Sequence, residues 1–117
     1  MTSFLVDTDV LVDSLRGARR FRLPDSSDGA ISVITRAELY AGRNAESQPI
    51  EELLGSLREL PLDPTTATEA GRLRRDHGLG LGDAVIAATA LATARVVMTR
   101  NDRHFRAVAG LHTQPPR

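Results

Sequence analysis

The chain has 117 residues, enough for one hydrophobic core and too few for two, so residues 1–117 are expected to form a single domain. Apolar residues make up 41% and charged residues 26%, which excludes a disordered or fibrous protein. Fifteen basic residues balance fifteen acidic ones, so a nucleic acid would have to be bound by local patches rather than by net charge.

Several classes of chemistry are excluded by missing residue types. The chain has no cysteine, which rules out disulfides, thiolate metal sites and a cysteine nucleophile. All its basic residues are arginines, which rules out a P-loop or a lysine Schiff base. The N-terminus does not resemble a signal peptide, and the longest apolar run, residues 84–94, is too short to cross a membrane. We therefore expect a cytoplasmic protein with no membrane partner.

The first half of the chain predicts two strand–helix steps. Residues 4–6 are a short apolar run ending at Asp7, and Thr8 is predicted to cap a helix that continues to about Leu15. Residues 29–34 predict a second buried strand. Thr35 and Glu38 follow with the spacing of a capping box, so a second helix is expected to begin there, with Glu38 in its first turn.

The second half continues the alternation of helices and strands. Residues 50–57 carry apolar positions at helical spacing, with Ser47 and Pro49 as start signals, and residues 60–62 predict a brief strand. The remaining predicted elements are a helix from Pro64 to Gly78, a helix from Asp83 to about Ala94, a strand over residues 95–99, a helical turn capped by Asn101 and a loose tail at residues 115–116.

Strands separated by helices predict an α/β fold with a mainly parallel central sheet. Ligands of such sheets gather at the carboxyl ends of the strands. Acidic residues follow the predicted strands or begin the next helix at this edge, at positions Asp7, Glu38, Asp83 and Asp102. Each also has a purely structural interpretation, as the end of a strand, part of a capping box or a favourable charge at a helix N-terminus.

The helix faces favour a functional interpretation of these acids. Asp83 shares a stripe with Ile86 and Ala90, and Glu38 shares one with Ile34 and Ala41, so both are expected to point inward. Clustered carboxylates repel one another, and no arginine is predicted among them, so a divalent cation would be the neutralising partner. Ligation by oxygen alone favours Mg²⁺ or Mn²⁺ over zinc.

Other polar residues are interpreted as peripheral. Asp9 and Asp13 are one helical turn apart near Arg16 and are predicted to form a solvated charged face, with Asp9 kept as a residue behind the metal ligands. The three histidines, His77, His104 and His112, show no metal-binding spacing, and His104 is expected to be a bystander near the site.

Four segments carry a resemblance to a known family. They are residues 4–11 (FLVDTDVL), 35–39 (TRAEL), 81–90 (LGDAVIAATA) and 98–105 (MTRNDRHF). In this order they resemble the PIN-domain nucleases, and among these the VapC toxins of VapBC toxin–antitoxin pairs. The resemblance implies a Rossmann-like α/β/α sandwich, a homodimer, a Mg²⁺ or Mn²⁺ site, and an endoribonuclease that cleaves RNA, often transfer RNA, under the control of a VapB-type antitoxin.

The resemblance also implies residue roles. Asp7 and Asp83 resemble the principal metal-holding acids, Glu38 the third acid, and Thr8 and Thr99 the small hydroxyl residues beside the site. The last motif departs from the family, because Asn101 stands where an acid is common. Two outcomes are open there: Asn101 faces the metal site, or Asp102 reaches it and restores the charge. We favour a catalytic role for Asp102.

The implied chemistry is attack on the phosphodiester by a water that the metal activates. Arginines at the rim are expected to contact the RNA phosphates, the candidates being Arg36, Arg43, Arg100 and Arg103. One alternative takes Asp7 as the nucleophile of an aspartyl-phosphate phosphatase, but such proteins ordinarily also need a lysine. The other is a catalytically silent PIN-like module that only binds protein, against which the retained acids argue.

Overall fold

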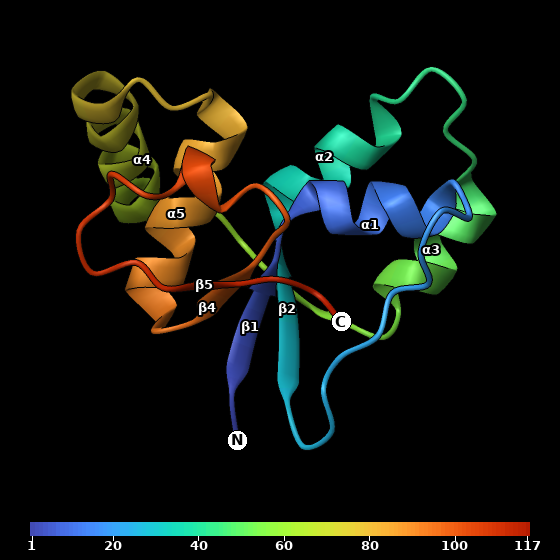
Figure 1. Cartoon of the computed structure of the whole chain (residues 1–117). Helices are drawn as coiled ribbons and strands as arrows, with labels where there is room; N and C mark the ends of the chain where they lie inside the picture. Colours follow the sequence, from blue (N-terminus) through green and yellow to red (C-terminus); the bar gives the residue numbers. More distant parts are fainter.

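A five-stranded sheet forms the centre of the computed structural model, which describes all of residues 1–117 (Figure 1). Its strands are β1 (Ser3–Val6), β2 (Asp28–Ser32), β3 (Arg58–Leu60), β4 (Val96–Met98) and β5 (Thr113–Gln114). They lie in the order β3-β2-β1-β4-β5, and every neighbouring pair is parallel. The predicted α/β fold is confirmed, with a sheet that is wholly rather than mainly parallel.

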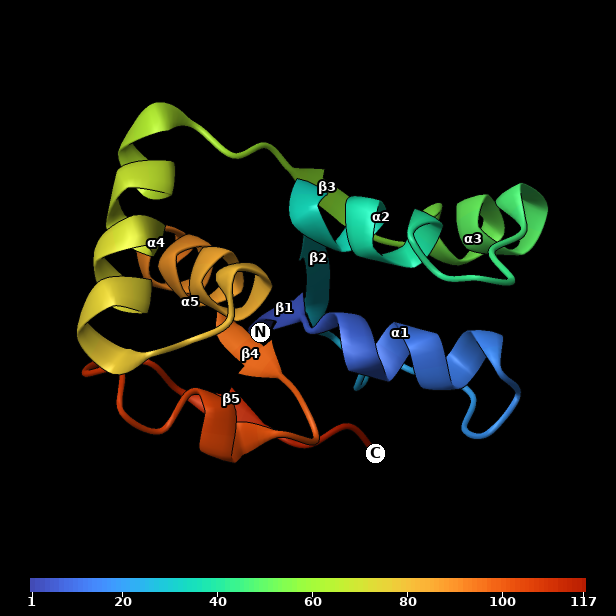
Figure 2. The same cartoon turned by 90° about the horizontal axis from the view of Figure 1, so that it is seen from above.

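Helices cover both faces of the sheet (Figure 2). One face carries α1 (Thr8–Leu15), α2 (Val33–Tyr40) and α3 (Ser47–Leu54), and the other carries α4 (Pro64–His77) and α5 (Leu81–Thr93). The predicted α/β/α sandwich is therefore confirmed. None of these helices combines the length and the apolar character that crossing a bilayer requires.

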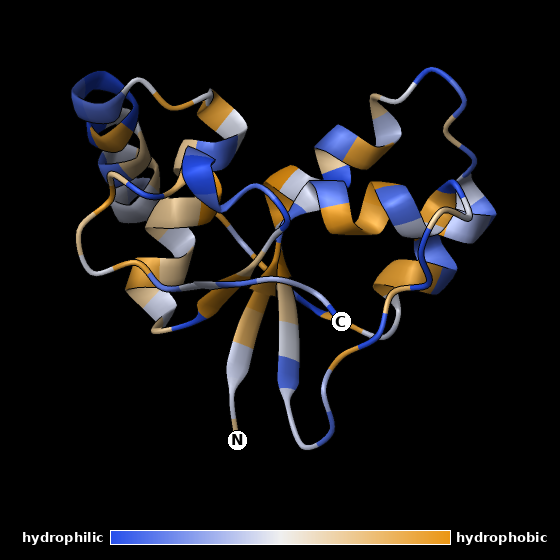
Figure 3. Ribbon diagram, in the orientation of Figure 1, coloured by the Kyte–Doolittle hydropathy of each residue, from blue (hydrophilic) through white to orange (hydrophobic).

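Alternation along the strands divides the apolar side chains between two cores. Phe4 and Val6 of β1 pack with Ile31 and Met98 against α1, α2 and α3. Leu5 and Val97 face the other way, toward α4 and α5. The central strands are accordingly apolar where the helices cover them, as the hydropathy colours show (Figure 3). The rigid sheet between these cores fixes the positions at which β1, β2 and β4 end.

The first two helices start earlier than the sequence predicts. The Asp7 carboxylate caps α1 by accepting a hydrogen bond from the Thr8 amide at 2.8 Å, so Thr8 is a helical residue and not the cap. Ser32 caps α2 by accepting from the Ile34 amide at 3.1 Å. The predicted capping box is therefore wrong, and Glu38 lies in the second turn of α2. In both cases a polar residue at the very end of the strand, Asp7 after β1 and Ser32 as the last residue of β2, reaches the free amides first.

The C-terminal half matches its prediction at α4 and differs elsewhere. Helix α4 begins at Pro64 and ends at Gly78, which adopts the left-handed conformation with φ 68°. Helix α5 begins two residues before the predicted start, β3 lies two residues before its predicted position, and β5 was not predicted. Asn101 precedes a 3-10 turn, Asp102–His104, but its side chain does not cap that turn.

Candidate active site

The carboxyl ends of β1, β2 and β4 meet where the chain order in the sheet reverses, the place where open α/β sheets bind ligands. A cavity of about 370 Å³ opens there, and we call it the acidic cleft. Its lining residues are Asp7, Thr8, Asp9, Val12, Asp13, Arg16, Glu38, Asp83, Asn101 and His104. The predicted acids are thus brought together: Asp7 from the junction of β1 and α1, Glu38 from α2 and Asp83 from α5.

Asp7 is the buried acid of the cleft, with an exposed fraction of 5%. One carboxylate oxygen accepts from the Thr8 amide, and the other accepts from the Thr99 hydroxyl at 2.8 Å. Burial raises the pKa of Asp7 to about 8, and the nearby charges of Asp9 and Asp83 add to this effect. The Asp7 charge therefore has hydrogen-bond donors but no counterion.

Asp83 lies in the first turn of α5 and contacts His104. Its Oδ2 is 3.2 Å from the Nδ1 of His104. Burial raises the pKa of Asp83, an effect that His104 opposes and Asp9 reinforces. His104, expected to be a bystander, thus lies in direct contact with one of the predicted metal-holding acids.

Glu38 lines the cleft from α2 and is held by the hydroxyl of Thr8, which is itself in contact with a second hydroxyl, that of Thr35. Its Oε1 accepts a hydrogen bond from Thr8 Oγ1 at 2.6 Å. Thr8 Oγ1 lies in turn 3.0 Å from the hydroxyl of the fully buried Thr35. Glu38 itself is exposed, so the expectation that it points into the interior is wrong, although its carboxylate does face the other acids.

Asp9 belongs to the cleft, contrary to its interpretation as part of a solvated face. Asn101 Nδ2 donates a hydrogen bond to Asp9 Oδ2 at 2.6 Å, and Asp9 Oδ1 is buried with no partner. Asp102 is exposed, pairs with Arg106 at 3.3 Å and does not line the cleft. The expectation that Asp102 reaches the acids is therefore wrong, because the chain turns so that Asn101 faces them.

The predicted phosphate-binding arginines are distributed differently from expectation. Arg36 lies outside the cleft, bound by Glu51 and Glu59. The Arg100 guanidinium contacts Asp13 at 2.5 Å, which shows that an arginine does reach the acids of the cleft. Arg43 is exposed on the turn after α2 and does not line the cleft.

Two other arginines flank the acids. Arg16, interpreted from the sequence as part of a charged face, lines the acidic cleft at the end of α1. Arg103 lines an adjoining cavity of about 380 Å³ that shares Asp83 and His104 with the cleft. The two cavities therefore adjoin one another at Asp83 and His104, and each contributes an arginine that forms no ion pair in the structure.

The donor atoms of the cleft fit a hard divalent cation. The unpartnered oxygen of Asp9 and the buried carboxylate of Asp7 both lack a positive partner, and every acid in the cleft offers only oxygen. No three acidic or histidine side chains, however, are close enough to hold one ion at once. The carboxylates thus share one cavity without forming a preassembled metal site.

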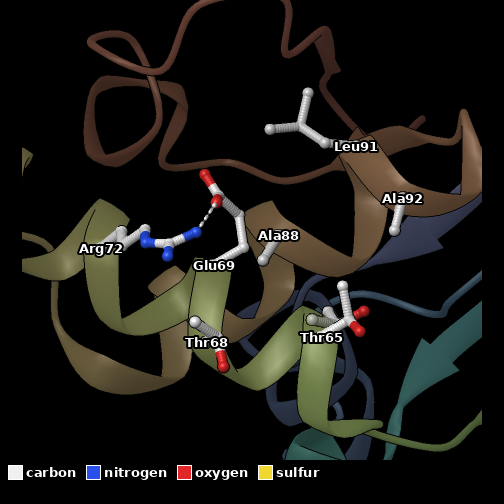
Figure 4. Close-up of a pocket in the computed structure, with 8 residues that line it drawn as sticks. Thr65, Thr68, Glu69, Arg72, Ala88, Leu91 and Ala92 are labelled. Atoms are coloured by element: carbon white, nitrogen blue, oxygen red, sulfur yellow. Dashed lines mark ion pairs between the residues drawn. The ribbon is translucent and has the colours of Figure 1, made fainter.

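A larger cavity, of about 550 Å³, lies between α4 and α5 (Figure 4). It is lined by Thr65, Thr66, Thr68, Glu69, Arg72, Ala88, Leu91 and Ala92. Its single acid, Glu69, pairs with Arg72 at 3.7 Å. With its one carboxylate paired in this way, the cavity has no group of acids comparable to the cleft.

Comparison with known proteins identifies the family to which this fold belongs. The family model for the PIN domain matches residues 4–111, so the chain belongs to the PIN-domain family. It is 44% identical over 112 residues to ribonuclease VapC10 of Mycobacterium tuberculosis, covering 86% of this chain and 84% of the relative. Within the family, the chain is therefore a VapC-type ribonuclease toxin.

Two further matches extend over nearly the whole chain. The tRNA(fMet)-specific endonuclease VapC of Shigella flexneri is 27% identical, with 97% of this chain and 98% of the relative covered. A toxin–antitoxin complex from Klebsiella pneumoniae contains a chain that is 29% identical and superposes with a TM-score of 0.73, covering 92% of this chain and 93% of that one.

Proposed function

We propose that this protein cleaves RNA internally at the acidic cleft, with Mg²⁺ or Mn²⁺ as its cofactor. The observation that carries the proposal is the buried carboxylate of Asp7, whose pKa is raised to about 8 beside Asp9 and Asp83. Burying an acid whose ionised form has no positive partner does not stabilise the fold. A cation that neutralises it accounts for its presence at the carboxyl edge of the sheet.

The residues of the cleft divide into two roles. Asp7 and Asp83 would hold the cation, together with the unpartnered oxygen of Asp9. When bound, the cation lowers the pKa of a water and balances charge that builds on the phosphate. Glu38 accepts a hydrogen bond from the Thr8 hydroxyl and is available to receive a proton from that water.

The polar neighbours orient these acids. Thr99 donates to Asp7, Asn101 donates to Asp9, and His104 contacts Asp83, so each carboxylate proposed to hold the cation has at least one polar partner. Partners of this kind set the direction in which a ligand oxygen points. Because these contacts already orient the carboxylates, only small movements would be needed for them to close on an ion.

RNA would lie across the acids and be held at its phosphates by Arg16 on one side and Arg103 on the other. Arg16 lines the acidic cleft and Arg103 the adjoining cavity, whereas Arg36 and Arg100 are already paired with carboxylates. The planar guanidinium suits phosphate because it donates two parallel hydrogen bonds. Transfer RNA is the first substrate to test, because it is what the name of the Shigella relative specifies.

The partner that we propose is a VapB-type antitoxin, which would block the cleft in the cytoplasm until it is removed. A basic side chain of the antitoxin would satisfy the same unpaired carboxylates that attract the cation. We also propose that two copies of the chain associate as a homodimer. Sedimentation equilibrium of the purified protein would test the dimer directly.

The test of the function is RNA cleavage by the purified protein with Mg²⁺, with Mn²⁺ and with EDTA. We expect cleavage with either metal and none in EDTA, and we expect Asp7→Asn, Glu38→Gln and Asp83→Asn to abolish it. Arg72 lines the cavity between α4 and α5 and not the acidic cleft, so Arg72→Ala serves as the control variant and should cleave normally. Equal cleavage in EDTA would contradict the metal requirement, and no cleavage of any RNA would favour a silent protein-binding module.

A further inference from the structure

The second residue of α5, Gly82, lies directly against the carboxylate of Glu38. A Cβ atom built on Gly82 would lie 2.6 Å from Oε2 and 3.1 Å from Cδ of Glu38. The three nearest atoms to that position all belong to Glu38. Since Glu38 Oε1 accepts the Thr8 hydroxyl, the carboxylate is enclosed between a hydroxyl on one side and bare backbone on the other.

We infer that Gly82 is a positioning residue for Glu38. Because it has no Cβ, the carboxylate of Glu38 can lie against the first turn of α5, next to Asp83 and facing the rest of the acidic cleft. The inference rests on the proposed metal-dependent function. It assigns a role to a residue that carries no chemistry of its own.

The local backbone does not require a glycine at this position. Gly82 is within α5 and is not among the residues with positive φ, so any L-residue could adopt its conformation. Alanine is also the better helix former, which means that glycine weakens α5. Close approach of Glu38 is the one contact in the structure that explains the missing side chain.

A Gly82→Ala substitution should therefore move Glu38 without damaging the fold. The atoms that collide with the new methyl group belong to the end of an exposed, flexible side chain, which can swing aside. In doing so, Glu38 would give up the hydrogen bond from Thr8. The melting temperature of the metal-free variant should equal or exceed that of the wild type.

The chain offers a matched control. Gly71 lies within α4, and a Cβ there would meet nothing within 4 Å. Gly71→Ala thus makes the same chemical change in a helix but leaves Glu38 untouched. In metal-free protein labelled with ¹³C at the glutamate carboxyls, we expect the Glu38 resonance to shift in Gly82→Ala and to stay in place in Gly71→Ala. An unchanged Glu38 resonance in Gly82→Ala would overturn the inference, whether or not the protein is a nuclease.

The second measurement is Mn²⁺ binding by calorimetry, together with cleavage, in a double-mutant cycle. Gly82→Ala should lower the cleavage rate by roughly 10–100-fold and leave Mn²⁺ affinity nearly unchanged, because it displaces the carboxylate proposed to accept the proton. Glu38→Asp shortens the side chain and removes the collision, so adding Gly82→Ala to Glu38→Asp should cost much less. An equal loss in both backgrounds would show that Gly82 acts by another route. No Mn²⁺ binding by the wild type would contradict the proposed function, while the carboxyl resonance would still decide the role of Gly82.

Discussion

At the scale of single residues, Asp7 shows the sharpest conflict between burial and charge. Its carboxylate is almost completely buried, yet its nearest charged neighbours are acids. A raised pKa means that the folded chain holds a proton which the unfolded chain has released. Raising the pH from about 4 to about 8 should therefore destabilise the metal-free protein, the opposite of the usual behaviour of an ion-paired aspartate.

Asp7→Asn should remove this dependence. The amide keeps the shape of the side chain and can still accept from the Thr8 amide, but it carries no charge to desolvate. In EDTA at pH 7 we expect the free energy of unfolding to rise by roughly 2–4 kcal/mol. Urea unfolding of both proteins between pH 5 and pH 8 would measure it. If the free energies of unfolding of the two proteins changed with pH in the same way, burial of Asp7 would not be the cause of the pH dependence.

Asn101 and Asp102 lead to a second prediction at this scale. Asn101→Ala removes the one hydrogen bond that holds Asp9, so the Mg²⁺ concentration needed for half-maximal cleavage should rise about tenfold. Asp102→Asn breaks only an exposed pair with Arg106 and should leave that concentration unchanged. A Mg²⁺ titration of the cleavage rate compares them. A raised requirement in Asp102→Asn alone would restore the role that the sequence suggested for Asp102.

These residues also show which parts of the site the sequence predicts. Asp7 and Asp83 could be found because one ends an apolar strand and the other heads an apolar helix face, patterns visible within a few residues. Asp9 and Asn101 could not, because their contact joins positions 92 residues apart. On the sequence alone, Asp9 has the spacing of a solvated pair with Asp13. Only the packing of the sheet, which brings Asn101 to Asp9, shows that Asp9 belongs to the cleft instead.

At the scale of elements, α4 and α5 end in the same way with different residues. Gly78 after α4 and Ala94 after α5 both adopt the left-handed conformation, with φ of 68° and 53°. This conformation strains alanine but not glycine. Ala94→Gly should therefore raise the free energy of unfolding by about 1 kcal/mol, and Gly78→Ala should lower it by a similar amount. Thermal unfolding of both variants tests these two expectations. Melting temperatures that shift in the same direction in both variants would contradict them.

The elements themselves were predictable to different degrees. Helix α4 was predicted at both ends because Pro64 and Gly78 act through local backbone geometry. The starts of α1 and α2 were misplaced because two residues capable of capping lie near each other, and the end of the strand decides between them. Strand β5 has two residues and no hydrophobic alternation, so only its pairing with β4 identifies it.

At the scale of the whole molecule, metal binding and folding should be linked. The acids of the cleft come from segments that are separate in the unfolded chain, so a cation should bind the folded state far better. We expect Mg²⁺ or Mn²⁺ to raise the melting temperature, and Asp7→Asn to abolish the increase. Differential scanning fluorimetry with each metal would measure this. An equal increase in melting temperature in the wild type and in Asp7→Asn would mean that the ion binds outside the acidic cleft.

RNA binding gives a further prediction at this scale, because the net charge of the chain is zero and local arginines must supply the attraction. Arg16→Ala and Arg103→Ala should each weaken RNA binding and reduce the slope of log affinity against log salt by about one unit. Arg72→Ala removes the same charge away from the cleft and should leave the slope unchanged. RNA-binding titrations from low to high salt, with Ca²⁺ in place of Mg²⁺, would measure these slopes. Equal changes of slope in all three variants would contradict the proposed RNA path.

The strand order sets when the cleft can exist at all. Asp7 leaves the ribosome well before the hydroxyl that orients it, which belongs to Thr99, 92 residues later. Strand β4, which brings Thr99 and Asn101 to β1, is translated after all five helices. A nascent or prematurely terminated chain therefore lacks the cleft, however well its first half folds. The toxin would become dangerous only after β4 has been synthesised, so a cell has the time taken to translate these 92 residues in which to have antitoxin ready.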